Sequence, residues 1–205
     1  MSLEPCGLTK TGRTLGLVLR SAGVLAVVGL LAGCASAPLA TFDLSAPSNN
    51  VKGRALRGVL VVPEPVAPAP IDGDRIVVRT SPSAVAVVKG AQWVDRLPHL
   101  LQTRLIQTFE NARLLKSVSR PGDGVSADYS LAWEIRRFEM NAETGRAVVE
   151  LSVKVLTPAG KIVAAQIFTG DAPGAAGDGA GASMALDAAS NTVLRQIVVW
   201  ASARV

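Results

Sequence analysis

Residues 146–156 alternate between apolar and polar side chains, and this alternation constrains the fold more than any other feature of the chain. One face carries Val149, Leu151, Val153 and Val155, and the other carries Glu150, Ser152 and Lys154. A strand with this pattern buries one face and exposes the other to water. A turn at 158–160 predicts that residues 161–168 return as its antiparallel neighbour. The rest of the chain must therefore supply an apolar cover for one face of a sheet.

Further β-rich segments extend this sheet. Residues 130–138 alternate in the same way until Arg137 and Phe138, where the break in alternation predicts a β-bulge. Ser81-Pro82-Ser83 has the turn chemistry of a hairpin between two neighbouring strands. The shorter strands are expected at 58–62, 75–80 and 85–89, with a brief one within 41–44. The sequence thus predicts an antiparallel or mixed sheet of about six strands.

Two amphipathic helices are predicted to cover the sheet. Residues 95–112 place their apolar side chains on one stripe, with Pro98 in the first turn and Asp95 as the N-cap. A second helix is expected at 183–203, and its stripe consists of Leu186, Ala189, Val193, Ile197 and Trp200. Residues 170–182 are mostly Gly, Ala and Asp and are predicted to form a loop. The prediction is a single α+β domain in which the sheet packs against two helices.

The N-terminal residues have the pattern of a secretory leader. Three basic residues precede an apolar run at 21–31, which is about half the roughly 20 residues that a membrane-spanning helix needs. The run ends in Leu31-Ala32-Gly33-Cys34, which resembles the lipobox of bacterial lipoproteins. This resemblance implies cleavage between Gly33 and Cys34, with acyl chains added to the new N-terminal cysteine. The alternative is a secreted protein or a signal anchor whose cysteine stands there by chance.

These observations divide the chain into three parts. Residues 1–33 are interpreted as a lipoprotein signal peptide, 34–56 as the lipidated N-terminus and tether, and 57–205 as the folded domain. Stable membrane anchoring needs at least two attachment signals, and several acyl chains on one residue supply them. Ala35 follows the cysteine where an Asp would resemble an inner-membrane retention signal. We therefore expect the outer membrane, with the domain facing the periplasm.

Composition limits the other classes of function. Removing 33 of the 205 residues leaves 172, which are enough for one hydrophobic core. The formal net charge of +5 is small and dispersed, whereas a nucleic-acid-binding protein would show a basic stripe. Cys6 lies in the predicted leader and Cys34 is predicted to be acylated, so we expect no disulfide in the mature chain. With His99 as the single histidine, we also expect no metal and no cofactor.

The segment Trp93-Val94-Asp95-Arg96-Leu97-Pro98, at the head of the first helix, resembles the Trp-x-Asp/Glu-x-Leu-Pro signature of the ABC-type transport auxiliary lipoproteins. That family includes the Pqi-system lipoprotein. Further matches follow in order at 72–79, at 131–138 and at Trp200, so the resemblance covers about 40–203. It implies a lipoprotein that works with an inner-membrane ABC transporter and an MCE-domain (mammalian cell entry) protein to move lipids between membranes. Two departures are the aliphatic residues 85–88, where relatives often carry a Tyr, and the long segment 170–182.

No combination of side chains predicts catalysis. His99 stands alone as a base, and the glycines at 174–181 lack the Lys-Ser/Thr ending of a phosphate-binding loop. Asp72 and Asp74 fit a turn before a strand, while Glu134 and Glu150 fit cross-strand pairs with Arg136 or Lys154. The alternation pattern and the helix stripe place Trp133 and Trp200 in the core. Trp93 fits either a hydrophobic staple or a partner contact.

The leading hypothesis is a non-enzymatic, outer-membrane lipoprotein that docks an MCE conduit to the outer membrane, as a homo-oligomer. Its candidate contact residues are Trp93, Asp95, Leu97 and Pro98, together with the loop at 170–182. One alternative is a periplasmic lipid-binding module with a pocket between the helices and the sheet. Another is a lipoprotein adaptor of a different envelope complex. A hydrolase is disfavoured because no nucleophile–base pair is present.

Overall fold

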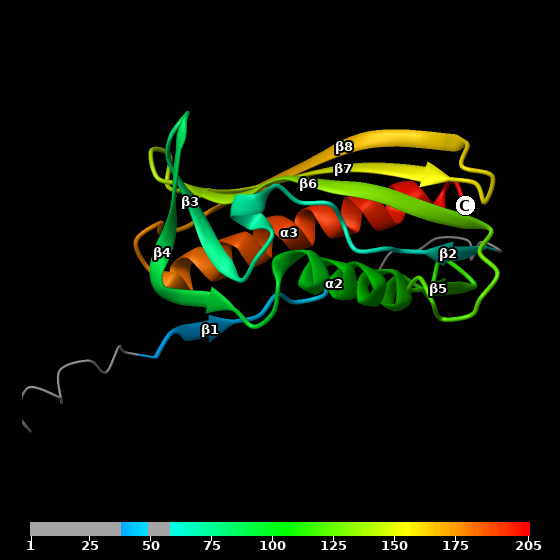
Figure 1. Cartoon of the computed structure of the whole chain (residues 1–205), viewed down its shortest axis with the longest axis horizontal. Coiled ribbons are helices and arrows are strands. Elements are labelled where there is room, and N and C mark those ends of the chain that lie inside the picture. The colour runs from blue at the N-terminus through cyan, green and yellow to red at the C-terminus, as the bar shows by residue number, and fades with distance from the viewer. Residues whose placement is uncertain (1–37, 49–57) are drawn as a thin grey trace, which may run out of the picture. The chain divides into compact units, whose positions relative to one another are not determined.

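The computed structural model describes residues 38–48 and 58–205, and Leu39–Val205 is one compact unit. The predicted cleavage and lipidation site at Gly33 and Cys34 lies outside the described residues. Figure 1 shows the elements in chain order. They are β1 (Ala40–Phe42), β2 (Val59–Val61), the 3-10 helix η2 (Ala69–Ile71), β3 (Arg75–Ser81), β4 (Ala84–Trp93), α2 (Leu97–Ala112), β5 (Ser117–Ser119), β6 (Tyr129–Asn141), β7 (Arg146–Leu156), β8 (Ile162–Pro173) and α3 (Gly179–Ser202).

The strands form one mixed sheet of eight strands. The order β1-β4-β3-β6-β2-β5 is joined by β7, which pairs with β6, and by β8, which pairs with β7. Strand β6 is central because β7 follows one of its edges while β2 and β3 pair with opposite ends of the other edge. Between those ends Val66 pairs with Glu134 as an isolated bridge. The α+β prediction is confirmed, and eight strands replace the expected six or so because short pairings such as β5 give too little sequence pattern to recognise.

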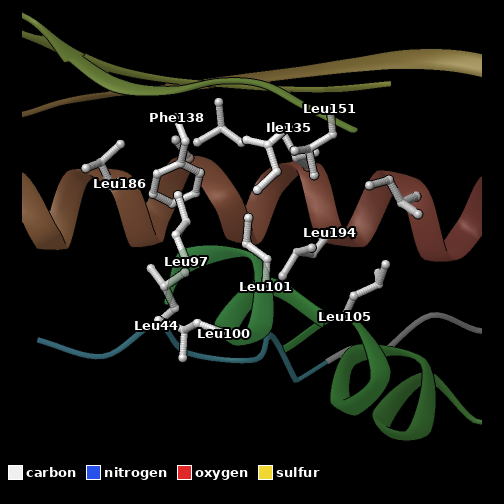
Figure 2. Packing of buried hydrophobic residues seen from close by; sticks show 14 of the residues in the cluster. Leu44, Leu97, Leu100, Leu101, Leu105, Ile135, Phe138, Leu151, Leu186 and Leu194 are labelled. Atoms are coloured by element: carbon white, nitrogen blue, oxygen red, sulfur yellow. The ribbon is translucent and has the colours of Figure 1, made fainter. Parts of the chain in front are cut away.

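Both helices cover the same face of the sheet. Helix α3 lies under β7 and β8, and α2 lies beside α3 (Figure 1). Figure 2 shows Leu97 and Leu101 of α2 pointing toward Phe138 and Ile135 of β6, with Leu186 of α3 alongside. All five of these side chains are essentially inaccessible to water. The apolar stripes of the helices and the alternation of the strands therefore meet in one core, as predicted.

Local predictions for β6, β7 and the hairpin are also confirmed. The register between β6 and β7 shifts between Ile135 and Arg137, which is the bulge expected at the break in alternation. Strands β7 and β8 are antiparallel, and the turn after Ser81 joins β3 to β4. Trp133 and Trp200 are both buried, and Trp200 packs edge-on against Phe168 with ring centroids 5.3 Å apart.

The predicted loop at 170–182 is shorter than expected and covers only 174–178. Strand β8 continues to Pro173, and α3 begins at Gly179 with Asp178 as its N-cap, which accepts the Gly181 N–H at 2.8 Å. The small residues serve close packing: a Cβ on Gly170 would lie 2.6 Å from the carbonyl oxygen of Ala189 in α3. Low side-chain volume, typical of loops, here allows a strand and a helix to approach each other.

Candidate functional site

The helix-head motif begins with a tryptophan that belongs to the core. Trp93 ends β4, and its backbone N–H donates to the carbonyl oxygen of Asp74 at 2.7 Å. Its side chain is 1% exposed and packs edge-on against Phe138, with ring centroids 5.9 Å apart. The N–H of Leu97 donates to the carbonyl oxygen of Gly73 at 2.9 Å. The motif therefore fixes the corner at which β3, β4 and α2 meet.

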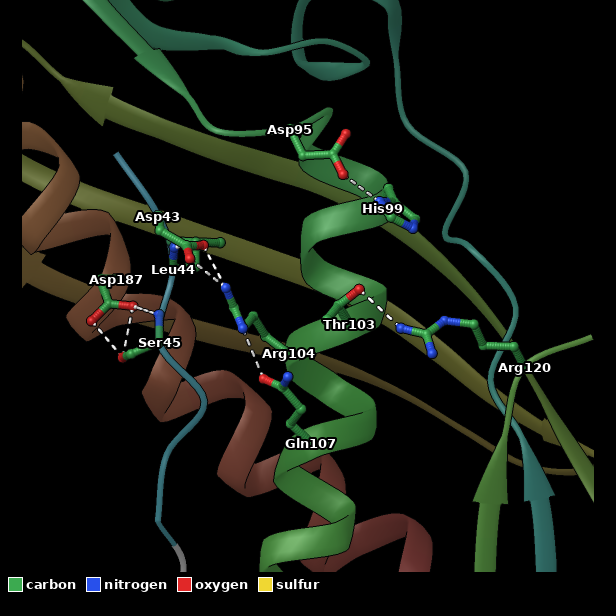
Figure 3. A network of polar contacts seen from close by, with 10 residues as sticks. All are labelled: Asp43, Leu44, Ser45, Asp95, His99, Thr103, Arg104, Gln107, Arg120 and Asp187. Carbon is green, nitrogen blue, oxygen red and sulfur yellow. Dashed lines mark hydrogen bonds and ion pairs between the residues drawn. The ribbon is translucent and has the colours of Figure 1, made fainter. Parts of the chain in front are cut away.

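Asp95 is exposed and does not cap the helix through its side chain, so the predicted N-cap is wrong. The N-cap residue is Arg96, which makes no side-chain capping bond, because the helix begins two residues later than expected. One carboxylate oxygen of Asp95 instead accepts the Arg96 N–H at 2.7 Å, and the other contacts Nδ1 of His99 at 2.5 Å (Figure 3). The hydrogen bond with His99 lowers the pKa of Asp95.

Arg96 ties this corner to the segment that precedes β3. Its guanidinium contacts the carboxylate of Asp72 at 2.5 Å and that of Glu64 at 3.0 Å, and these bonds raise its pKa. Of the four predicted contact residues, the fold buries Trp93, Leu97 and Pro98 and exposes Asp95. Contact with a partner at this corner stays a prediction, and among the four predicted residues Asp95 has the accessible side chain.

Residues 39–48 form a strap across the two helices. Strand β1 pairs in parallel with β4, with Ala40 opposite Ala91, and Leu44 is buried. Figure 3 shows the polar contacts on either side of Leu44. Asp43 accepts from Arg104 of α2 at 2.5 Å, and the Ser45 N–H donates to Asp187 of α3 at 2.6 Å. Residues 39–48 of the predicted tether (34–56) are therefore packed onto the domain.

A buried carboxylate is the strongest electrostatic feature that the sequence pattern does not reveal. Glu139 of β6 has a side chain that is 4% exposed, and it accepts from Nε of Arg79 at 2.7 Å and from Nε of Arg137 at 2.9 Å. Burial raises the pKa of Glu139, but hydrogen bonds from the two guanidinium groups outweigh it, so the net pKa is lowered. The carboxylate is fully paired, which makes it a structural joint between β3 and β6.

The described residues contain no group of three or more His, Cys, Asp or Glu side chains that could hold a metal ion. Of the four acidic residues considered for chemistry, Asp72, Asp74 and Glu150 have ion-pair partners instead. Asp72 pairs with Arg96, and Glu150 pairs with Arg136 at 3.0 Å, as the cross-strand prediction expected.

An apolar groove lies at the edge of the fold, between β8 and α3. It has a volume of about 490 Å³, and its lining includes Phe168, Val199 and Trp200. The space between the helices and the sheet is filled by core side chains (Figure 2). Neither helix of the described part of the chain is long and apolar enough to cross a membrane.

Comparison with known proteins identifies the family. A curated relative, an uncharacterized protein of Bradyrhizobium diazoefficiens, is 31% identical over 185 residues; the match covers 87% of this chain and 49% of the relative, so the chain spans about half its length. A crystal structure of a Xanthomonas campestris protein has a TM-score of 0.72 at 27% identity, covering 81% of this chain and 95% of that one.

A hypothetical protein of Chlamydia trachomatis has a TM-score of 0.51 at 10% identity, covering 73% of this chain and 98% of that one, and it shares the fold alone. The model of the ABC-type transport auxiliary lipoprotein component matches residues 41–198. That range includes the helix-head motif, all of α2 and most of α3, which confirms the resemblance seen in the sequence. The chain therefore belongs to the family of ABC-type transport auxiliary lipoprotein components.

Proposed function

We propose that this protein is a non-enzymatic subunit of an intermembrane lipid transport system, anchored in the outer membrane through acylated Cys34, that docks a periplasmic MCE conduit there. Family membership associates the chain with ABC-type transport and with a membrane-associated location in the cell envelope. The proposal goes beyond family membership in three respects: the outer membrane as the location, an MCE-domain protein as the partner, and a homo-oligomeric state.

The observation that carries the proposal is the family match over residues 41–198, directly downstream of the lipobox-like Leu31-Ala32-Gly33-Cys34. The fold adds a mechanical argument. The strap is held by Asp43, Leu44 and Ser45, so an anchor at Cys34 would be tied directly to both helices. A protein that positions another component at a membrane needs this kind of rigid attachment more than it needs a reactive site.

Replacing Cys34 with Ser is expected to release the protein into the soluble periplasmic fraction, because acylation requires the thiol. Fractionation of outer membrane, inner membrane and periplasm measures the effect, and intact mass shows whether the acyl chains are present on the wild type. A wild-type protein that stays unmodified at Cys34 after loss of its leader would contradict the anchoring step. Recovery of the wild type with the inner membrane would contradict the outer-membrane step.

Docking is tested at Asp95, the exposed residue of the helix head. Asp95→Arg reverses a charge that the fold does not bury, so we expect co-purification with the MCE-domain protein of the same genome to fall several-fold while the melting temperature changes little. Glu110→Arg, on the exposed side of the same helix, is the matched control and should co-purify normally. Equal recovery of both variants with the MCE protein would remove Asp95 from the contact surface.

The lipid-binding alternative is favoured by one observation, the apolar groove beside Phe168 and Trp200. Lipid that co-purifies with the protein lacking its own acyl chains would support that alternative. The groove would then be the proposed lipid-binding site, and substitutions that fill it should reduce the amount of lipid that co-purifies.

A further inference from the structure

The length of chain between the proposed anchor and the fold limits which part of the domain can reach a membrane. Four residues, 35–38, connect Cys34 to Leu39, where the compact unit begins. Five Cα-to-Cα steps span at most about 18 Å even at full extension. Leu39 itself is held in place because the next residue, Ala40, pairs with Ala91 of β4. If Cys34 is acylated as proposed above, the bilayer lies within this distance of the start of β1.

The two ends of the domain are separated by more than this reach. Helix α3 has 24 residues and is therefore about 36 Å long. Its first residue lies beside the strap, since a Cβ on Gly179 would be 3.3 Å from the Phe42 ring. Strands β2 and β5 lie toward the opposite end, near the C-terminus of α3 (Figure 1). The end that contains β1, the β3–β4 hairpin and the first turn of α3 is thus the end that a short anchor can bring to the membrane.

The outer part of the β3–β4 hairpin exposes valines and carries no charge of its own, and the guanidinium of Arg79, which donates to the carbonyl oxygen of Pro82 in the turn, is paired with Glu139. The nine residues 80–88 contain no ionisable side chain, and Val85 and Val87 are 44% and 48% exposed. Figure 1 shows the hairpin projecting away from the rest of the sheet. Within residues 38–48 and 58–205, β3 pairs with β6 only at Val78–Arg79 and β4 pairs with β1 only at Ala91–Trp93, so in that part of the chain the hairpin edges beyond these pairs have no strand neighbour. Soluble proteins normally protect such edges with charged side chains or proline.

The hairpin is also long enough for its tip to reach the membrane plane that the anchor on Cys34 can reach. Strand β4 changes direction at Gly90, whose φ of +72° is in the left-handed region, and its register with β3 jumps there. Gly90 is the residue next to Ala91, at the level where Leu39 enters the fold. Val85 is five residues from Gly90, about 17 Å along an extended strand. The hairpin tip and an acyl anchor on Cys34 can therefore reach the same plane.

We propose that the β3–β4 hairpin contacts the lipid surface beside the anchor, with Val85 and Val87 at the interface of the bilayer. This inference rests on the proposed acylation of Cys34. The contact removes exposed apolar side chains from water and sets the orientation of the domain, since a second point of attachment restricts rotation about the short connection. The opposite end, with β2 and β5, then faces away from the membrane.

The test uses the full-length acylated protein in vesicles of phosphatidylethanolamine and phosphatidylglycerol. A thiol-reactive fluorophore is placed at Val85→Cys, and the matched control is Val125→Cys, a valine of equal 44% exposure in the β5–β6 connection. A lipid with a nitroxide on its acyl chain near the glycerol quenches labels close to the interface. We expect quenching to be several-fold stronger at position 85 than at position 125.

The outcomes separate this inference from the anchoring proposal. Intact mass and flotation with vesicles establish whether the protein is acylated and bound. Acylated, bound protein with equal quenching at the two positions would overturn the hairpin contact and leave the anchor in place. Protein that is neither acylated nor bound would overturn the anchor and the hairpin contact with it. A label at position 85 that becomes shielded without lipid, as the protein concentration rises, would assign the hairpin to a second copy and also overturn the inference.

Discussion

Replacing Glu139 with Gln is expected to lower the free energy of unfolding by about 2–3 kcal/mol at neutral pH. The substitution keeps the shape of the side chain but removes the negative charge that pairs with Arg79 and Arg137. Removing one partner of a buried ion pair lowers the free energy of unfolding by more than the intact pair contributes to it, because the remaining charges lose their partner. Both guanidinium groups are partly exposed, so the effect should lie below that of a fully buried pair. Chemical denaturation with a two-state fit measures it.

Glu150→Gln is the matched control for this prediction. Glu150 also forms an ion pair with an arginine on the sheet, but its side chain is 22% exposed, compared with 4% for Glu139. Exposed pairs contribute about 0–1 kcal/mol. Equal losses of unfolding free energy in the two variants would show that burial and the second arginine do not distinguish Glu139.

The same carboxylate predicts a dependence on pH. Its folded-state pKa is lowered, so its contribution to stability is present above the unfolded pKa and is lost as the pH falls through the folded pKa. The difference in unfolding free energy between wild type and Glu139→Gln should therefore be full at neutral pH and shrink below about pH 4.5, the reference value for a free Glu. A difference that stays constant down to strongly acidic pH would contradict this assignment.

Glu139 also shows what a single sequence can and cannot predict. Periodicity predicted β6 and β7 well, because strands that bury one face carry their pattern in neighbouring residues. It did not predict that Arg79 meets Glu139, since the two lie 60 residues apart and meet through the parallel pairing of β3 with β6. Strand order depends on long-range contacts that no local pattern contains.

The helix-head motif was found in the sequence, whereas the roles of its residues were not. Trp93 fitted either packing or contact with a partner, and the structure places it against Phe138 in the core. That neighbour comes from β6, so the distinction needed the sheet topology. The strap was likewise predicted only as a short strand in a tether, because its polar anchors, Arg104 and Asp187, belong to two distant helices.

Gly170→Ala is expected to lower the free energy of unfolding by about 2–3 kcal/mol, the upper part of the range for overpacking a core. The added methyl group would lie 2.6 Å from the carbonyl oxygen of Ala189 and 2.8 Å from Cγ2 of Val193. The nearest obstacle is helix backbone, which cannot rotate away as a side chain can, so β8 and α3 must separate along their contact. Chemical denaturation measures the loss, and hydrogen exchange should locate it in β8 and α3 first.

Gly177→Ala provides the matched control, because nothing lies within 4 Å of its added methyl group and its backbone is not in the left-handed region. Alanine has less conformational freedom in the unfolded chain than glycine. The free energy of unfolding of Gly177→Ala should therefore be unchanged or higher by about 0.5 kcal/mol. If the glycines of 170–182 only gave a loop its freedom, the two substitutions would have the same small effect. A large loss at Gly170 alone would instead mean that this glycine is retained for the approach of α3 to the edge of the sheet, where low side-chain volume serves packing and not flexibility.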